Sequence, residues 1–193
     1  GIKKTQRDVA AAATSPKLGS ADHSSYRSVT MRGSYLAQDR TDLCESVKNL
    51  ARSMQAPTQA DLQDLKHFGR YLKGCPRVVW RFQRQHMIKN IRVFTDADHA
   101  GCLKTRRSTS GRCAMLGRHC VKGSSTLQST IALSVGESEF YALTKGAAFG
   151  LQLQGFLRDW GYQLPLVIVT DSNSAIGTVS RQGLGKLRHV QTR

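Results

Sequence analysis

The sequence has few acidic residues, because 13 aspartates and glutamates stand against 29 lysines and arginines, and the formal net charge is +16 over 193 residues. It also lacks any run of about 18 apolar residues, which excludes a transmembrane helix. The five cysteines form no CxxC pair, so a zinc site and a disulfide framework are both disfavoured and a reducing compartment is indicated. The charge surplus predicts a polyanionic partner, with nucleic acid ahead of an anionic membrane surface.

The chain divides into three stretches of different pattern. Residues 1–24 are rich in Lys, Ala, Ser and Thr without apolar periodicity, which predicts a flexible linker. Helical patterns fill residues 25–76, and Thr58 with Asp61 has the spacing of a capping box at the start of the second one. From residue 77 the period becomes that of strands, so residues 77–193 are expected to form an α/β domain.

The order of elements in this domain predicts a sheet with a helical crossover. Strands are expected at residues 78–82, 91–96, 108–116 and 119–121, then a long helix after Ser134, a strand at 166–170 and a short helix at 173–181. A helix between a meander and an apolar strand implies that the last strand is parallel within the same sheet. Asp96 and Asp171, each at the carboxyl end of a strand, should then lie at one sheet edge, where ligands bind in open α/β sheets.

The crossover helix offers two glutamates, and its periodicity separates their roles. Glu139 shares the face that is expected to pack on the sheet. The other residues expected on that face are Leu143, Ala147, Leu151 and Leu157. Glu137 lies about 200° around the helix and fits reciprocal capping with Ser134. A glutamate on the apolar face, directed at two aspartates, would be an unpaired buried charge unless a cation neutralised it.

Asp96, Glu139 and Asp171 are therefore predicted to bind Mg²⁺ or Mn²⁺, which prefer oxygen ligands and need no His or Cys. For Asp96 alone, a solvated turn with an Asx cap is the alternative. Such a cluster suits phosphodiester hydrolysis: one cation lowers the pKa of a water, and a second about 3.5–4 Å away stabilises the leaving 3′ oxygen.

Four motifs occur in the second half of the sequence: residues 95–101 (TDADHAG), 107–111 (RSTSG), 134–143 (SVGESEFYAL) and 170–176 (TDSNSAI). In this order they resemble the signatures of the ribonuclease H domain in copia-type retrotransposon Pol polyproteins. Upstream stretches at residues 26–36, 40–43 and 70–74 resemble the helices that join the reverse transcriptase thumb to that domain. Four motifs in the correct order make the resemblance more specific than any one of them.

The resemblance implies an α/β ribonuclease H-like fold that is truncated at its C-terminus and preceded by a helical segment. It implies cleavage of the RNA strand of RNA–DNA hybrids with Mg²⁺ or Mn²⁺. Asp96 matches the first-strand aspartate of the family, Glu139 the helix glutamate and Asp171 the aspartate before the second helix. The expected partners are the hybrid, its backbone and an upstream reverse transcriptase in the same polyprotein, without a membrane. The expected location is the cytoplasm, a virus-like particle or the nucleus.

Additional contacts with nucleic acid are expected from residues in the motifs and in the basic loop before the second of them. These are Arg106, Arg107, Ser108, Thr109, Ser110 and Asn173. The hydroxyl groups could bond a phosphate or a 2′-hydroxyl, although polar residues that open a strand are common without that role.

The sequence departs from the family in ways that affect its expected activity. His99 and Gly123 stand where the family usually has Trp, and the fourth family carboxylate is expected beyond Arg193. We therefore expect a piece of a longer protein, which binds hybrid but cuts it slowly or not at all. The alternative is a catalytically inactive nucleic-acid-binding remnant of a retroelement. An integrase core is disfavoured, because such nucleases usually supply their glutamate last.

Overall fold

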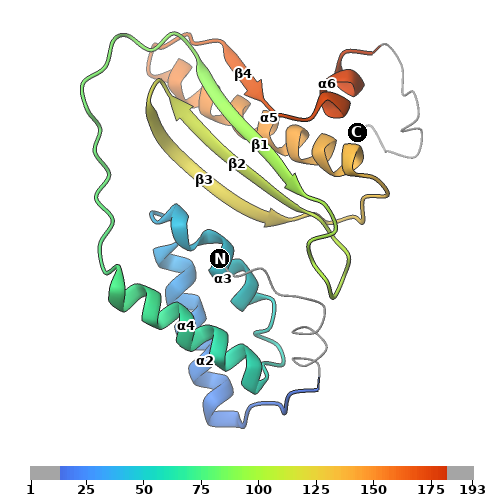
Figure 1. Ribbon diagram of the computed structural model, residues 1–193. Helices are drawn as coiled ribbons and strands as arrows, with labels where there is room; N and C mark the ends of the chain where they lie inside the picture. Colours follow the sequence, from blue (N-terminus) through green and yellow to red (C-terminus); the bar gives the residue numbers. More distant parts are fainter. Residues whose placement is uncertain (1–13, 182–193) are drawn as a thin grey trace. The chain divides into compact units, whose positions relative to one another are not determined.

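Figure 1 shows the computed structural model of the chain, which describes residues 14–181. The start of the predicted linker, residues 1–13, and the end of the predicted second domain, residues 182–193, lie outside the described residues. The chain divides into two compact units, Gly1–Arg81 and Phe82–Arg193. Each unit is described by itself.

The first unit is helical. It contains α2 (Ser20–Leu36), the 3₁₀ helix η1 (Thr41–Leu43), α3 (Cys44–Ala51) and α4 (Gln59–Gly74). One apolar cluster joins them and comprises Tyr26, Leu43, Val47, Leu50, Leu65 and Phe68. The Tyr26 hydroxyl donates to the Leu50 carbonyl at 2.8 Å, so the buried ring keeps its polar end satisfied. The capping box predicted for Thr58 and Asp61 is confirmed at the start of α4.

The predicted linker becomes ordered before its expected end. The Leu18 amide donates to the Pro57 carbonyl at 3.0 Å, which attaches the chain ahead of the first helix to the loop before α4. Helix α2 then begins at Ser20, so the helical part of the chain starts earlier than residue 25.

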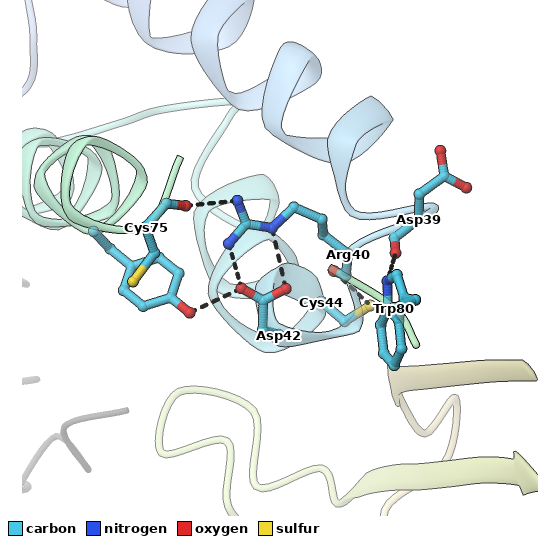
Figure 2. Close-up of polar contacts among 7 residues, drawn as sticks. Asp39, Arg40, Asp42, Cys44, Cys75 and Trp80 are labelled. Carbon is cyan, nitrogen blue, oxygen red and sulfur yellow. Dashed lines mark hydrogen bonds and ion pairs between the residues drawn. The ribbon is translucent and has the colours of Figure 1, made fainter. Parts of the chain in front are cut away.

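A polar network ties η1 to the C-terminal end of α4 (Figure 2). The Arg40 guanidinium donates to both carboxylate oxygens of Asp42, at 3.2 and 2.6 Å, and to the Cys75 carbonyl at 2.8 Å. The Tyr71 hydroxyl donates to Asp42 Oδ2 at 2.8 Å. The hydrogen bond from Arg40, with the one from Tyr71, holds the pKa of the Asp42 carboxyl below its usual value.

The strand predicted at residues 78–82 is wrong, because none of these residues lies in a strand. The Trp80 indole donates to the Asp39 carbonyl at 3.3 Å (Figure 2). Phe82 meets the His119 ring edge-on, with 5.2 Å between the ring centroids. An apolar run forms a strand only where another strand offers backbone partners, and this run is held by side-chain contacts instead.

The second unit is built on a four-stranded sheet. β1 (Ile91–Asp98), β2 (Thr109–Leu116) and β3 (His119–Leu127) form an antiparallel meander. β4 (Leu166–Val169) pairs parallel with β1, which gives the order β3-β2-β1-β4. The α/β class and the parallel pairing are thus confirmed, while the third strand runs well beyond the predicted residue 121.

Helix α5 (Val135–Asp159) packs on β1, β2 and β4, and α6 (Asn173–Val179) packs on α5 (Figure 1). The predicted buried face of this helix is partly wrong, because Leu151 is 59% exposed. The apolar positions and glycines that are buried in α5 are Ala142, Gly146, Gly150 and Leu157. A Cβ at Gly150 would lie 2.6 Å from Leu166 Cδ1, so the helix turns its glycines to the sheet and approaches it closely.

None of the helices within residues 14–181 combines the length and the apolar character that crossing a membrane requires.

Candidate metal centre

Two aspartates lie at equal offsets from the last paired residues of two parallel strands. Phe94 of β1 pairs with Val169 of β4, and Asp96 and Asp171 each follow their paired residue by two positions. Both carboxylates are exposed. Because neighbouring parallel strands point the same way, equal offsets bring both side chains to one end of the sheet.

The first turn of α5 supplies the third carboxylate, and capping fixes how that turn begins. The Ser134 hydroxyl accepts a hydrogen bond from the Glu137 amide at 3.2 Å. The Glu137 carboxylate accepts one from the Leu133 amide at 2.8 Å, so the predicted capping role of Glu137 holds, although its partner is one residue earlier than expected. A Cβ at Gly136 would lie 2.8 Å from Ser174 Oγ, so this turn sits close against the start of α6.

The structure brings Asp96, Glu139 and Asp171 together. One carboxylate oxygen from each lies within 4.8 Å of the others. Glu139 is buried at 7% exposure, whereas the two aspartates are exposed. The cluster therefore combines one buried carboxylate from the helix with two exposed carboxylates, one from β1 and one from the loop after β4.

The negative charge of Glu139 is unfavourably placed, because the side chain is buried next to two other acids. Its Oε1 accepts a hydrogen bond from the Ala97 amide at 3.3 Å, but its Oε2 is buried without a hydrogen-bond partner among the described residues. Burial, then the charges of Asp96 and Asp171, raises the pKa of the Glu139 carboxyl, and the bond from Ala97 only partly opposes this. A carboxylate in this position needs either a proton or a cation.

These residues fit a divalent cation. The donors are three carboxylates with neither His nor Cys, which is the ligand chemistry of Mg²⁺ and Mn²⁺. A cation would also give the buried Oε2 of Glu139 the partner that residues 14–181 do not provide. The fit thus rests on the orphaned oxygen as well as on the proximity of the acids.

Gln128 is a positioning residue that the sequence did not single out. It is buried, and its Nε2 donates to Ser110 Oγ and to the Ser138 carbonyl, each at 2.9 Å. Gln128 therefore ties β2 to the first turn of α5, next to Glu139. An isolated glutamine between a strand and a loop carries no local signal of such a role.

The residues predicted to contact nucleic acid differ in their placement. Ser108 and Ser110 are buried, and the Ser108 hydroxyl accepts from the Ala100 amide at 3.0 Å. Their positions fit a structural role, because neither hydroxyl faces solvent. Thr109 is half-buried, whereas Arg106, Arg107 and Asn173 are exposed. The three exposed residues keep side chains that a nucleic acid could reach.

The chain resembles several known proteins, among them a Pol polyprotein of a transposon. It is 36% identical over 127 residues to an uncharacterized mitochondrial protein of Arabidopsis thaliana, covering 66% of this chain and 52% of that protein. It is 31% identical over 171 residues to the retrovirus-related Pol polyprotein from transposon RE1 of the same plant, covering 84% of this chain and 12% of the polyprotein.

A third relative is the secreted RxLR effector protein 161 of Plasmopara viticola, with 37% identity over 106 residues, 55% of this chain and 74% of the effector. No protein-family model matches the chain. The chain thus spans about half of the mitochondrial relative and a small part of the polyprotein.

Proposed function

Because this chain is similar to retrotransposon Pol polyproteins over 84% of its length, we propose that its second unit is a metal-dependent nuclease module with a ribonuclease H-like fold. Its substrate is the RNA strand of an RNA–DNA hybrid. In the intact polyprotein the module follows a reverse transcriptase and works inside the cell. The choice of hybrid comes from the order of the motifs around Asp96, Glu139 and Asp171.

The observation that carries this proposal is the buried Oε2 of Glu139, which has no hydrogen-bond partner in the described part of the chain and lies beside two exposed aspartates. Glu139, Asp96 and Asp171 would each give an oxygen to Mg²⁺ or Mn²⁺. When bound, such a cation supplies positive charge that lowers the pKa of a water and stabilises the leaving oxygen of a phosphodiester. The protein contributes the arrangement: Ala97 orients one oxygen of Glu139 and leaves the other for the ligand.

The exposure of the aspartates and the charge of the chain support a polyanionic substrate. Asp96 and Asp171 face solvent, so a phosphate can approach them from outside the sheet. Three acids alone would repel a phosphate, but the net charge of +16 attracts a nucleic acid at long range. A cation between the acids and the phosphate would remove the repulsion between them, so that the attraction by the net positive charge of the chain prevails.

The test uses labelled RNA–DNA hybrid with Mg²⁺ and two forms of the protein, the 193-residue chain and a form extended by its natural downstream sequence. We expect the extended form to cut the RNA strand. Asp96→Asn should abolish cutting, whereas Asp98→Asn should leave most of it. Asp98 is the matched control, because it is an exposed aspartate at the end of the same strand but outside the cluster.

Cutting that survives Asp96→Asn would refute the assignment of the acids. Salt-sensitive binding of hybrid by both forms, without any metal-dependent cutting, would instead identify the catalytically inactive remnant that the sequence left as an alternative.

A further inference from the structure

Two half-buried cations lie together where β2 faces α5. The Arg112 guanidinium lies over the Phe149 ring, 5.1 Å from its centroid. Lys145 precedes Phe149 by four residues on α5, so the two side chains share one side of the helix. Within residues 14–181, neither Arg112 nor Lys145 forms an ion pair with an acidic group. The contact with Phe149 occupies one face of the guanidinium and leaves its N–H groups available.

An unsatisfied hydroxyl stands beside this pair. Ser124 of β3 is the cross-strand partner of Arg112, so both side chains extend from the same face of the sheet. Its Oγ is buried and has no hydrogen-bond partner among the described residues. Buried hydroxyl groups in folded proteins are usually hydrogen-bonded, and an oxygen atom of a ligand would supply the missing partner.

The charges of the pair are unfavourable without a ligand. Burial, and then the positive charge of Arg112, lowers the pKa of the Lys145 ammonium. An anion between the two cations would reverse the second effect. Phosphate suits the three groups, because a guanidinium donates to it through two parallel N–H bonds while an ammonium and a hydroxyl each add one donor.

We infer that Arg112, Lys145 and Ser124 bind a backbone phosphate of the nucleic-acid strand, apart from the acids that cut it. This inference rests on the proposed function, since it takes its ligand from there. Lys145 follows Glu139 by six residues, a rise of about 9 Å along α5. That span corresponds to roughly two to three nucleotides of one strand, at about 3.4 Å each. The site would hold the strand in register relative to the cutting position.

The experiment measures binding of a fluorescent RNA–DNA hybrid to the whole 193-residue chain over a series of salt concentrations, without divalent metal so that nothing is cut. The variants are Arg112→Gln, Lys145→Gln and the double variant. Because both cations contact the same phosphate, the double variant should lose that one contact and flatten the slope of log K against log salt by about 0.7 to 0.9, and each single variant should lose part of this. Ser124→Ala should weaken binding several-fold without changing the slope.

Arg158→Gln is the control, because it removes one exposed positive charge near the end of the same helix. Arg112→Lys and Lys145→Arg keep the charges and should keep most of the slope, which separates a binding role from a folding defect. The inference is overturned if the double variant changes the slope no more than Arg158→Gln does. A flattened slope in a protein that never cuts hybrid, even when extended, would retain the phosphate site and reject the nuclease.

Discussion

Replacing Glu139 with glutamine tests the candidate metal centre without relying on activity. The amide has nearly the shape of the carboxylate, and its oxygen can still accept the hydrogen bond from Ala97 that Oε1 accepts at 3.3 Å. The substitution removes only the negative charge, from a buried position within 4.8 Å of two other acids. In the absence of metal, the variant should therefore be more stable than the natural protein.

The size of this gain follows from the geometry. Two unit charges 4.8 Å apart repel by about 1 kcal/mol at the dielectric constant of water and by about 3.5 kcal/mol at an effective value near 20. Because Asp96 and Asp171 are exposed, solvent screens them, and we expect a total gain of about 1 to 3 kcal/mol in the free energy of unfolding. The measurement belongs around pH 8, well above the ordinary pKa of a glutamate, because a high pH favours the charged form of Glu139 against its raised pKa.

Urea denaturation with and without Mg²⁺ measures both halves of the prediction. The natural protein should gain about 1.4 kcal/mol when Mg²⁺ is at ten times its dissociation constant, because the cation binds only the folded state. Glu139→Gln should lose most of this gain. Its stability should then hardly depend on Mg²⁺.

Glu137→Gln is the matched control, because Glu137 is also a buried glutamate in the first turn of α5. Its carboxylate accepts from the Leu133 amide at 2.8 Å and from the Tyr141 hydroxyl at 2.9 Å. An amide offers only one acceptor oxygen, so this variant should lose about 1 to 3 kcal/mol and keep the effect of Mg²⁺. If Glu139→Gln is destabilised in the same way, or is still stabilised by Mg²⁺, the reasoning about the cluster is wrong.

Two other predictions concern pH and packing. Without metal, the folded state binds the proton of Glu139 more tightly than the unfolded chain does, so this group's contribution to stability should fall as pH rises from near 4.5 through the raised pKa. Comparing the urea midpoints of the natural protein with those of Glu139→Gln isolates this contribution. A constant difference between the two proteins over this pH range would contradict the prediction. Gly146→Ala should lower the melting temperature by an amount equivalent to about 1 to 2 kcal/mol, because its Cβ would collide with the stiff Thr95 side chain. Gly155→Ala on the same helix meets open space and should stabilise by about 0.5 to 1 kcal/mol, so equal effects at the two glycines would refute the packing argument.

Local signals were sufficient for the order of the elements in the second unit. The apolar alternation of β1, the helical period after Ser134 and the apolar run of β4 each depend on residues close together in the chain. The choice of Glu139 over Glu137 also came from helix geometry. The structure places Glu139 in the acidic cluster, although the buried face of α5 includes Ala142 and glycines and leaves Leu151 exposed.

Other features depend on partners that are distant in the sequence. Residues 78–82 have the sequence pattern of a strand, yet they do not pair with another strand. Ser110 looks like a surface contact, yet Gln128 binds its hydroxyl inside the unit. No spacing rule connects Arg112 with Lys145, since they meet only where β2 packs on α5.

By itself, the sequence determined the order of the strands and helices in the second unit, the capping of α4 and α5, and which acids could form a cluster. These features are local, because they depend on hydrogen bonds within a turn and on the period of a single strand or helix. Only the tertiary structure decided that Asp96, Glu139 and Asp171 come within 4.8 Å of one another. It also decided that one oxygen of Glu139 is buried without a hydrogen-bond partner from the rest of the described structure. Proximity and desolvation arise when segments far apart in the chain pack together, and no local pattern contains them.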